Sequence, residues 1–481
     1  MDRKVWIPRT FQPAGIAHIL GHKRCALFAS MGTGKSVMTL TALDILFLCE
    51  IETKPAIVFA PLRVAKDTWS DEAARWVNLR DITVSQIVGT ADERRVALAR
   101  KANVYTCNFE NIEWLAAELA GDWPFGMVII DESSRVKSFR GSETKKGNIK
   151  GQGSKRALTL AKMAFAKSTR WVNLTGTPAP NGLQDLFGQC WYLDGGERLG
   201  RTFTAFKNRW FRSVPGSDGY HQIEIMPFSE AQIHATIKDV CLTLRMEDFY
   251  PIDEFIDHTV YVDLPPKAAK AYKEMEKKLY TELTSGEKIE AFTAAAKSQK
   301  LAQFSSGAAY LGEAADYPGE RPWEVVHDEK LLALESIVEE AAGMPLLVVY
   351  QHKSDLARLL KHFPKGCHFD KNPKTKADFI AGKIPLLFLH PASAAHGVDG
   401  LQHATNIIVF FSQDWDLEKY QQASERIGPT RQFQSGYKRP AFRYHICARK
   451  TIDEVVMERR KSKSTVQDAL LEYLKRKDDE S

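Results

Sequence analysis

The chain has 481 residues, of which 26% are charged and 44% hydrophobic, and its formal net charge is +6. This length suffices for two or three domains with full cores, and the composition is ordinary for soluble globular proteins. No run of about 18 apolar residues occurs, so we expect no membrane span. Seven scattered cysteines without a C-x-x-C pair disfavour a zinc ribbon or a disulfide framework. Together with the absence of an apolar signal core at the start, this predicts a cytoplasmic protein.

Short apolar segments alternate with helical patterns along the first 195 residues. Five of them, rich in β-branched or aromatic residues, are the predicted strands at 25–29, 56–60, 104–106, 127–130 and 171–174. Such alternation predicts a parallel sheet covered by helices on both faces. Because these sheets bind ligands at the carboxyl ends of their strands, the residues that follow each strand are the first candidates for a site.

A glycine-rich turn follows the first of these strands and precedes a helical stretch that begins near Val37. It reads Met31-Gly32-Thr33-Gly34-Lys35-Ser36, the architecture of a nucleotide-phosphate site. The glycines allow backbone N–H groups to crowd around phosphate oxygens, Lys35 supplies a charge for the β- and γ-phosphates, and the Ser36 hydroxyl can bind Mg²⁺. The sequence departs from the usual motif at its first glycine, where Ala29 stands.

Two acids, Asp131 and Glu132, directly follow the predicted strand at 127–130. In a nucleoside triphosphatase, Asp131 would hold the metal directly or through water, and Glu132 would orient or deprotonate the attacking water. Adjacent acids after a strand often only cap a helix, and the local sequence leaves that interpretation open. Their position about 95 residues after Lys35, in the same predicted sheet, favours the catalytic interpretation.

The segment 135–156 carries eight cationic residues against a single acid, Glu143, and its glycines predict a loose conformation. Two interpretations remain: a solvated loop, or an arm that binds phosphates, which requires flexible cations and little else. On the second interpretation, the residues expected to contact nucleic acid are Lys145, Lys146, Lys150 and Lys155.

The strand at 171–174 runs into Thr175-Gly176-Thr177-Pro178. Two hydroxyls around a glycine suit a turn that senses both phosphate and a neighbouring ligand, which makes Thr175 a candidate contact to nucleic acid. A simple strand-to-loop turn is the alternative.

Beyond residue 198 the pattern changes. Amphipathic segments at 266–283 and 289–303 predict mostly helices, with a strand at 258–262. A second alternating block follows, with strands predicted at 346–350, 386–390, 406–411 and 443–447 and helices at 354–362 and 415–427. The predicted fold class is therefore α/β, with two parallel-sheet lobes at 1–198 and 327–481 and a helical linking segment at 199–326.

In order and spacing, these motifs resemble motifs Q, I, Ia, II and III of superfamily 2 helicases, specifically of the SNF2-like branch. The residues that carry the resemblance are Arg9-Thr10-Phe11-Gln12, the glycine-rich turn, 59–64 with Trp69 and Trp76, 131–137, and 174–181. The second block resembles motifs IV, V and VI at 347–351, 393–402 and 421–432, and 450–463 resembles the closing helix. The resemblance covers nearly the whole chain, and the compact second lobe looks most like short, phage-encoded members.

The resemblance implies two RecA-like lobes and assigns roles to the matched residues. Gln12 would read the adenine of ATP. The phosphates would be cradled by Gly32, Thr33, Gly34, Lys35 and Ser36, and Mg²⁺ would be held by Ser36 and Asp131. Arg426 and Arg431 would reach across to the γ-phosphate as arginine fingers and stabilise charge in the transition state. Ser393, in the motif V segment, would contact nucleic acid.

The sequence departs from the family pattern in two places. The second arginine of motif VI is usually three residues after the first, and that position holds Pro429. Either Arg431 takes the finger role through the Gly428-Pro429 turn, or Arg426 acts alone. Motif II ends in Ser133-Ser134, so the usual histidine that couples ATP to the second lobe is missing or replaced.

The resemblance implies an ATP-dependent translocase on double-stranded DNA that uses ATP and Mg²⁺, located in the host cytoplasm if it is phage-encoded. Two other functions stay open. One is a helicase that separates strands of DNA or RNA, and the other is a DNA-binding scaffold whose ATP cycle only switches partners.

Overall fold

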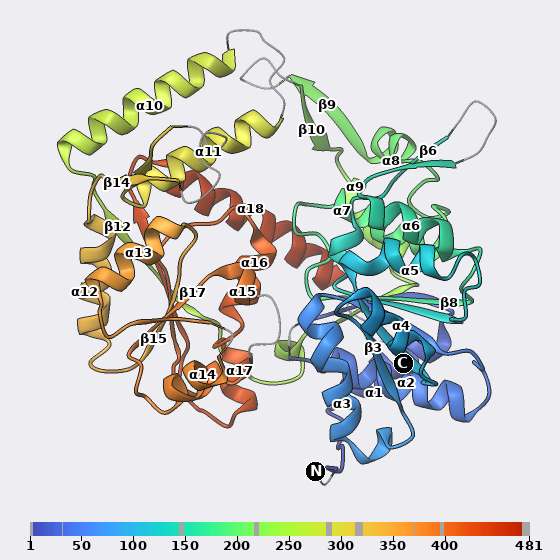
Figure 1. Ribbon diagram of the computed structural model, residues 1–481. Coiled ribbons are helices and arrows are strands. Elements are labelled where there is room, and N and C mark those ends of the chain that lie inside the picture. The colour runs from blue at the N-terminus through green and yellow to red at the C-terminus, as the bar shows by residue number, and fades with distance from the viewer. Residues whose placement is uncertain are drawn as a thin grey trace. The chain divides into compact units, whose positions relative to one another are not determined.

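The computed structural model describes residues 3–30, 32–143, 149–215, 221–284, 291–312, 321–370, 372–394 and 399–473. The chain folds into two compact units, one formed by Met1–Pro251 with Lys463–Ser481 and the other by Ile252–Ser462. Each unit is built around one large parallel sheet (Figure 1), which confirms the predicted α/β class with two parallel-sheet lobes. Across the described residues, no helix is both long and apolar enough to span a membrane.

The first unit contains a seven-stranded parallel sheet in the order β11-β1-β8-β5-β2-β4-β3. Its strands are β1 (Arg24–Ala29), β2 (Ala56–Ala60), β3 (Val84–Ile87), β4 (Val104–Asn108), β5 (Met127–Asp131), β8 (Arg170–Thr175) and β11 (Cys241–Leu244). All five predicted strands are present. The two that the sequence did not reveal, β3 and β11, are the edge strands, and each has only four residues.

Helices cover this sheet. They are α1 (Gln12–Gly21), α2 (Lys35–Leu48), α3 (Trp69–Arg75), α4 (Ala91–Ala99), α5 (Ile112–Glu118), α6 (Lys155–Ala164), α7 (Asp185–Asp194), α8 (Phe203–Trp210) and α9 (Ser229–Ile237). Since side chains alternate along a strand, one face of the sheet collects every second residue. Phe28, Phe59 and Ile130 on that face share a buried cluster with Leu160 of α6 and Phe187 of α7.

The basic segment is more ordered than the sequence predicted. β6 (Arg140–Glu143) and β7 (Ile149–Gln152) form an antiparallel hairpin, and α6 begins directly after it. The glycines serve packing: a Cβ at Gly151 would lie 2.5 Å from Leu158 Cδ2, and one at Gly153, where φ is +134°, would collide with the Ser138 carbonyl oxygen. The expectation of a loose segment is therefore wrong for these residues. A second hairpin joins β9 (Phe211–Pro215) and β10 (His221–Ile225).

The second unit contains a six-stranded parallel sheet in the order β12-β19-β18-β15-β17-β16. Its strands are β12 (Ile256–Val262), β15 (Leu346–Val349), β16 (Cys367–His368), β17 (Leu386–Leu389), β18 (Ile407–Phe410) and β19 (Phe442–Ala448). The five strands predicted in this part of the chain are all present. The missed strand, β16, is a two-residue edge strand.

Residues 199–326, the predicted linking segment, are divided between the two units. The unit boundary lies at Pro251 and Ile252, inside this stretch. Its first part adds β11 to the first sheet and its later part adds β12 to the second, because each strand pairs in parallel with a strand of its own lobe. The predicted helices are present as α10 (Pro266–Thr284) and α11 (Ala291–Ser305), and are followed by the pair β13 (Ala308–Tyr310) and β14 (Trp323–Val325).

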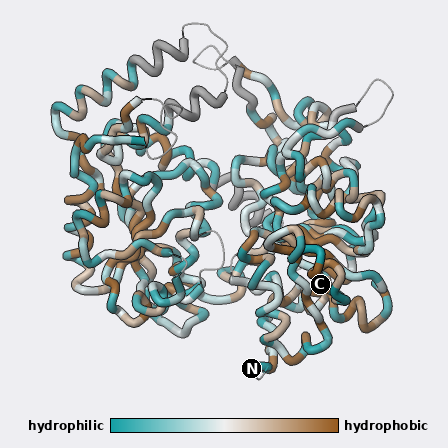
Figure 2. The backbone as a smooth tube through the Cα atoms, in the orientation of Figure 1, coloured by the Kyte–Doolittle hydropathy of each residue, from teal (hydrophilic) through white to brown (hydrophobic). Residues whose placement is uncertain are grey.

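The remaining helices of the second unit are α12 (Glu329–Glu340), α13 (Lys353–His362), α14 (Pro373–Ile380), α15 (Pro391–Ala394), α16 (Leu417–Ser424) and α17 (Pro429–Gln434), and α18 spans Ile452–Tyr473. Two buried clusters use alternate residues of β15, with Leu346 and Val348 in one and Leu347 and Val349 in the other. In Figure 2 the hydrophobic colour is concentrated in the interior of each unit.

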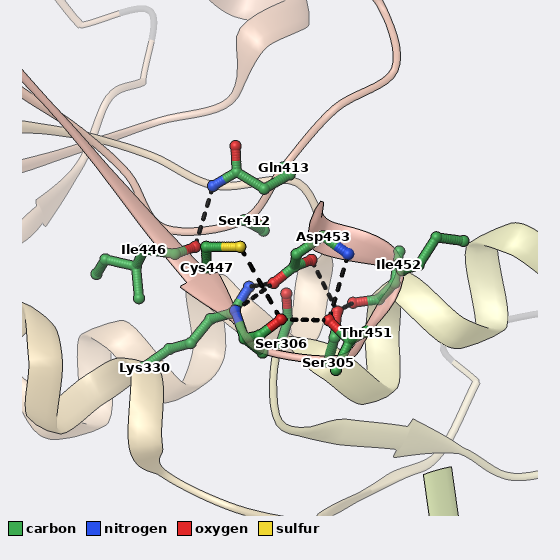
Figure 3. Close-up of polar contacts among 12 residues, drawn as sticks. Ser305, Ser306, Lys330, Ser412, Gln413, Ile446, Cys447, Thr451, Ile452 and Asp453 are labelled. Carbon is green, nitrogen blue, oxygen red and sulfur yellow. Dashed lines mark hydrogen bonds and ion pairs between the residues drawn. The ribbon is translucent and has the colours of Figure 1, made fainter. Parts of the chain in front are cut away.

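A buried polar cluster joins α11, α12 and the start of α18 in the second unit (Figure 3). Lys330 Nζ lies 2.6 Å from Asp453 Oδ2, and neither residue is more than 2% exposed. Ser305 Oγ donates to Asp453 Oδ1 at 2.9 Å. Because either charge alone would be costly to bury, the pair fixes how these helices pack.

Candidate nucleotide site

β1 leads into the glycine-rich turn, and α2 begins at Lys35. Gly32 and Gly34 have φ values of +79° and +84°, which glycine adopts without a Cβ penalty. A Cβ at Gly34 would also lie 2.6 Å from Gln12 Nε2. The first N–H groups of the 14-residue α2 have no side-chain cap, so this helix end favours an anion such as phosphate.

The Lys35 side chain folds back onto the start of the glycine-rich turn. Its Nζ donates to the carbonyl oxygens of Ala29 at 2.8 Å and Ser30 at 3.4 Å. Thr33 Oγ1 donates to the same Ser30 carbonyl at 2.7 Å, which keeps the turn compact. The ammonium is thus held where it could exchange carbonyl oxygens for phosphate oxygens. Ser36 is half-buried in the first turn of α2.

Gln12, at the start of α1, is 4% exposed, and both ends of its amide are engaged. Oε1 accepts a hydrogen bond from the Arg9 N–H at 2.9 Å, and Nε2 donates to the Thr33 carbonyl at 2.9 Å. Gln12 therefore joins the segment before α1 to the glycine-rich turn. Its predicted contact with adenine stays a prediction, and it requires the exchange of one of these bonds.

Asp131 ends β5 and is 7% exposed. Its Oδ2 accepts a hydrogen bond from Trp69 Nε1 of α3 at 3.0 Å. Burial raises the pKa of Asp131, while the charge of Lys35 and the Trp69 hydrogen bond act in the opposite direction. Lys35 follows β1 and Asp131 lies at the end of β5, and these two strands both flank β8 in the sheet. The sequence matched Trp69 to a motif but gave it no role.

Glu132 adopts a left-handed backbone conformation, with φ +71° and ψ +63°. A non-glycine residue in this region costs on the order of 1–3 kcal/mol, and such residues concentrate at functional sites. Its N–H bonds to the Leu174 carbonyl at 2.9 Å, which anchors the turn to β8. The Glu132 side chain does not cap the short 3-10 helix that follows at Ser133–Val136, so capping does not explain this acid.

Thr175 is fully buried at the end of β8, and its Oγ1 accepts a hydrogen bond from the Thr177 N–H at 3.0 Å. The hydroxyl therefore shapes the strand-to-loop turn, as the simpler interpretation held. The predicted contact of Thr175 with nucleic acid stays a prediction, and it requires this buried turn to move. The sequence missed a second residue here, Gln189 of α7, which donates to the Pro178 carbonyl at 2.6 Å.

In the second unit, Arg426 and Arg431 converge on one carboxylate. Arg426 Nη1 lies 3.6 Å from Asp399 Oδ1, and Arg431 Nη2 lies 2.9 Å from the same atom. Arg426 follows α16, and Pro429 occupies the first turn of α17, which carries Arg431. The Gly428-Pro429 turn thus brings Arg431 beside Arg426 despite the altered spacing.

The remaining candidates for nucleic-acid contact lie at the surface. Lys150 is exposed on β7 and Lys155 is exposed at the start of α6. Ser393 is exposed on α15. Lys145 and Lys146 lie outside the described residues. All of these contacts stay predictions.

The residues of the first unit fit a nucleotide with its metal. Within the described part of the chain, no three His, Cys, Asp or Glu side chains gather as a metal cage. Mg²⁺ at nucleotide sites needs only one or two protein ligands because phosphates and water supply the others. Asp131 and Ser36 are the donors that could hold it.

Comparison with known proteins identifies the family. The SNF2-related domain matches residues 20–306, more than half of the chain. The chain is 51% identical over 477 residues to putative protein p41 of Acyrthosiphon pisum secondary endosymbiont phage 1, covering 98% of this chain and 100% of that protein. The chain therefore belongs to the SNF2-related family, and its resemblance to phage-encoded members is confirmed.

The chain is also similar, more distantly, to one further protein sequence and to one solved structure. A RAD54-like DNA repair and recombination protein of Drosophila ananassae is 22% identical over 503 residues, covering 93% of this chain and 59% of that protein. Among solved structures, the Sulfolobus solfataricus SWI2/SNF2 ATPase core in complex with dsDNA aligns over 97% of this chain and 93% of its own, with 18% identity and a TM-score of 0.42.

Proposed function

We propose that the protein is an Mg²⁺-dependent ATPase that couples ATP hydrolysis to movement along double-stranded DNA. One observation carries the ATPase part: the glycine-rich turn that follows β1 and the carboxyl group of Asp131 at the end of β5 belong to one parallel sheet. β1, β8 and β5 are consecutive in the sheet, so the turns that follow them lie along one edge. A phosphate turn and a metal carboxylate at one edge suit phosphoryl transfer.

In this proposal each unit is one RecA-like lobe with its own task. The glycine-rich turn, through Gly32, Thr33, Gly34, Lys35 and Ser36, binds the triphosphate, and Gln12 selects adenine. Asp131 holds Mg²⁺ with Ser36, and Glu132 takes the proton of the attacking water. Arg426 and Arg431 stabilise charge on the γ-phosphate as it is transferred.

Duplex DNA is the proposed partner. Membership of the SNF2-related family and the similarity to RAD54-like DNA repair and recombination proteins support this choice. In the first unit, a cavity of about 530 Å³ lies at the carboxyl ends of β3 and β4, and its lining includes Lys66, Arg100, Asn108 and Asn111 beside Glu93. Cations and amides of this kind contact phosphates without reading bases, as movement along a backbone requires. The phage relative supports a place in the host cytoplasm.

The ATPase rate should be measured without nucleic acid and with single-stranded DNA, duplex DNA and RNA in parallel. We expect the largest stimulation by duplex DNA. Stimulation by RNA alone would overturn the duplex assignment. A rate that ignores every nucleic acid would favour the ATP-switched scaffold.

Movement is tested separately from hydrolysis. Displacement of a labelled third strand from a duplex, dependent on ATP and without separation of the duplex itself, is the expected result for a translocase. Release of one strand of a forked duplex would instead identify a strand-separating helicase.

A further inference from the structure

Gln189 lies between the two turns that end β5 and β8. It is fully buried on α7, and its Oε1 accepts a hydrogen bond from Ser133 Oγ at 2.7 Å. Its Nε2 donates to the carbonyls of Pro178 at 2.6 Å and Asp185 at 3.1 Å. Ser133 directly follows Glu132, and Pro178 closes the turn after β8. One amide therefore contacts both turns.

The backbone is arranged to hold this amide in place. Gly188 has no room for a side chain, since a Cβ there would collide with the Lys137 carbonyl oxygen. α7 can therefore approach the backbone that follows the two acids. Asn173 Nδ2 of β8 donates to the Gln189 carbonyl at 2.9 Å, and Trp171 Nε1 fixes Asn173 through a 2.9 Å bond to its Oδ1.

A carboxamide suits these contacts, since it accepts from a hydroxyl at one end and donates to carbonyls at the other. A methionine at this position would keep the length and lose both functions. A second link runs in parallel, because Lys137 Nζ lies 3.2 Å from Asp185 Oδ2, which also accepts from the Asn181 N–H at 2.8 Å. That link involves the half-buried Lys137 at the edge of the site, whereas Ser133 and Gln189 are both fully buried.

We propose that Gln189 is a positioning residue that couples the Asp131-Glu132 turn to the Thr175–Pro178 turn. The inference deepens the proposed ATPase function and rests on it for its catalytic consequence. The Gln189 carboxamide is rigid, and its hydrogen bonds to Ser133 and to the Pro178 carbonyl are short. A displacement of one turn is therefore transmitted to the other. The placement of Glu132 for catalysis then depends on the turn after β8.

A double-mutant cycle tests the coupling. Gln189→Met, Ser133→Ala and the double variant are compared by kcat and KM for ATP in the presence of duplex DNA. We expect Gln189→Met to lower kcat about tenfold with KM for ATP nearly unchanged, and the double variant to be no worse, since both changes break one connection. Leu186→Met, a fully buried change one turn earlier on α7, is the matched control and should leave kcat unchanged at a similar unfolding temperature.

Amide hydrogen exchange supplies a readout that does not depend on turnover. Gln189→Met should speed exchange in 132–137 and in 175–177 together, whereas Leu186→Met should speed neither. Wild-type kcat in Gln189→Met, fully additive effects in the cycle, or faster exchange confined to α7 would overturn the coupling. If the wild-type protein hydrolyses no ATP but the paired change in exchange is seen, the proposed function fails and the coupling stands.

Discussion

The two units hold their candidate catalytic groups in different ways. In the first unit, Asp131 and Gln12 are nearly buried and are fixed by hydrogen bonds to the protein itself. In the second unit, Arg426 and Arg431 share the carboxylate of Asp399, whose side chain is 67% exposed. In the first unit, Asp131 and Gln12 are therefore held by hydrogen bonds to uncharged groups. In the second unit, the arginines are held by a charged partner that water and salt can reach.

The difference has an energetic consequence. Leaving a buried hydrogen-bonding group without its partner costs about 1–3 kcal/mol, so the first site resists rearrangement. Ion pairs with an exposed member contribute only about 0–1 kcal/mol and weaken with salt. Arg431, whose side chain is 20% exposed, can therefore leave Asp399 for another anion at little cost, whereas the side chain of Arg426 is only 8% exposed. A triphosphate is such an anion, as the proposed arginine-finger role requires.

The largest effect is expected at Glu132 of the first unit. Glu132→Gln keeps the shape of the side chain and removes the base, so turnover should fall by about 10²- to 10⁴-fold while ATP binding is retained. Lys35→Ala should instead weaken ATP binding, because it removes charge from the phosphates. Single-turnover hydrolysis and binding of a fluorescent ATP analogue separate the two outcomes. Glu110→Gln, an acid that follows β4, two strands away from β5 in the same sheet, is the control. Wild-type turnover in Glu132→Gln would refute the catalytic assignment.

In the second unit, replacement of each arginine tests its proposed role as an arginine finger. Arg426→Ala and Arg431→Ala should each lower turnover by up to about 10³-fold with smaller changes in ATP affinity, since arginine fingers act on transition-state charge. We expect the larger effect for Arg426, whose motif position is the regular one. Lys419→Ala removes a cation from α16 that pairs with Asp416 and should have little effect. An unaffected Arg431→Ala variant would assign the finger role to Arg426 alone.

Replacement of Trp69 tests whether its hydrogen bond to Asp131 contributes to Mg²⁺ binding. Trp69→Phe removes the hydrogen bond that lowers the pKa of Asp131, so that pKa should rise further and the carboxylate should lose Mg²⁺ at a higher pH than in the wild type. We expect a loss of at least about tenfold in apparent Mg²⁺ affinity, since one hydrogen bond to a charged group contributes about 1.5–3 kcal/mol. Titration of ATPase with Mg²⁺ across pH 5–8 measures both effects. Trp76→Phe is the matched control, because that indole donates to Glu72, away from Asp131. Equal Mg²⁺ curves for the Trp69 variant and the wild type would contradict the role.

The sequence predicted the central strands of both sheets because strands buried on two faces read as continuous apolar runs. It missed β3, β11 and β16, which are short edge strands with less apolar patterning. Motifs identified Lys35, Asp131 and Glu132 because their chemistry depends on local order. The partners of Trp69, Gln189 and Asp399 could not be predicted, since they come from elements distant in sequence. The glycines of the basic segment were misinterpreted because packing against Phe139 and Leu158 has no local signature.

Substitutions in the basic segment test whether the first unit also carries surface charges that bind DNA phosphates. Replacing Lys145, Lys146, Lys150 and Lys155 by alanine should lower duplex affinity and reduce the salt dependence of log K by about 0.9 per lost phosphate contact. Basal ATPase without DNA should barely change. Lys162→Ala, an exposed cation near the end of α6, controls for net charge. Duplex affinity measured at several salt concentrations decides the matter, and an unaltered slope would leave the hairpin as a solvated element.

The smallest expected effect comes from the exposed carboxylate itself. Asp399→Asn removes the charge that holds Arg426 and Arg431 and keeps the side-chain shape. If this pair competes with a nucleotide for the two guanidinium groups, ATP should bind up to about fivefold more tightly, the upper value of such an ion pair. The gain should disappear as salt rises toward about 1 M, where the screening length is only about 3 Å. Asp378→Asn, which removes the half-buried partner of the exposed Lys383 in the same unit, is the control and should not alter ATP affinity. A tenfold loss of turnover in Asp399→Asn would instead show that the carboxylate orients the arginines for catalysis, and the second unit would then be as prearranged as the first.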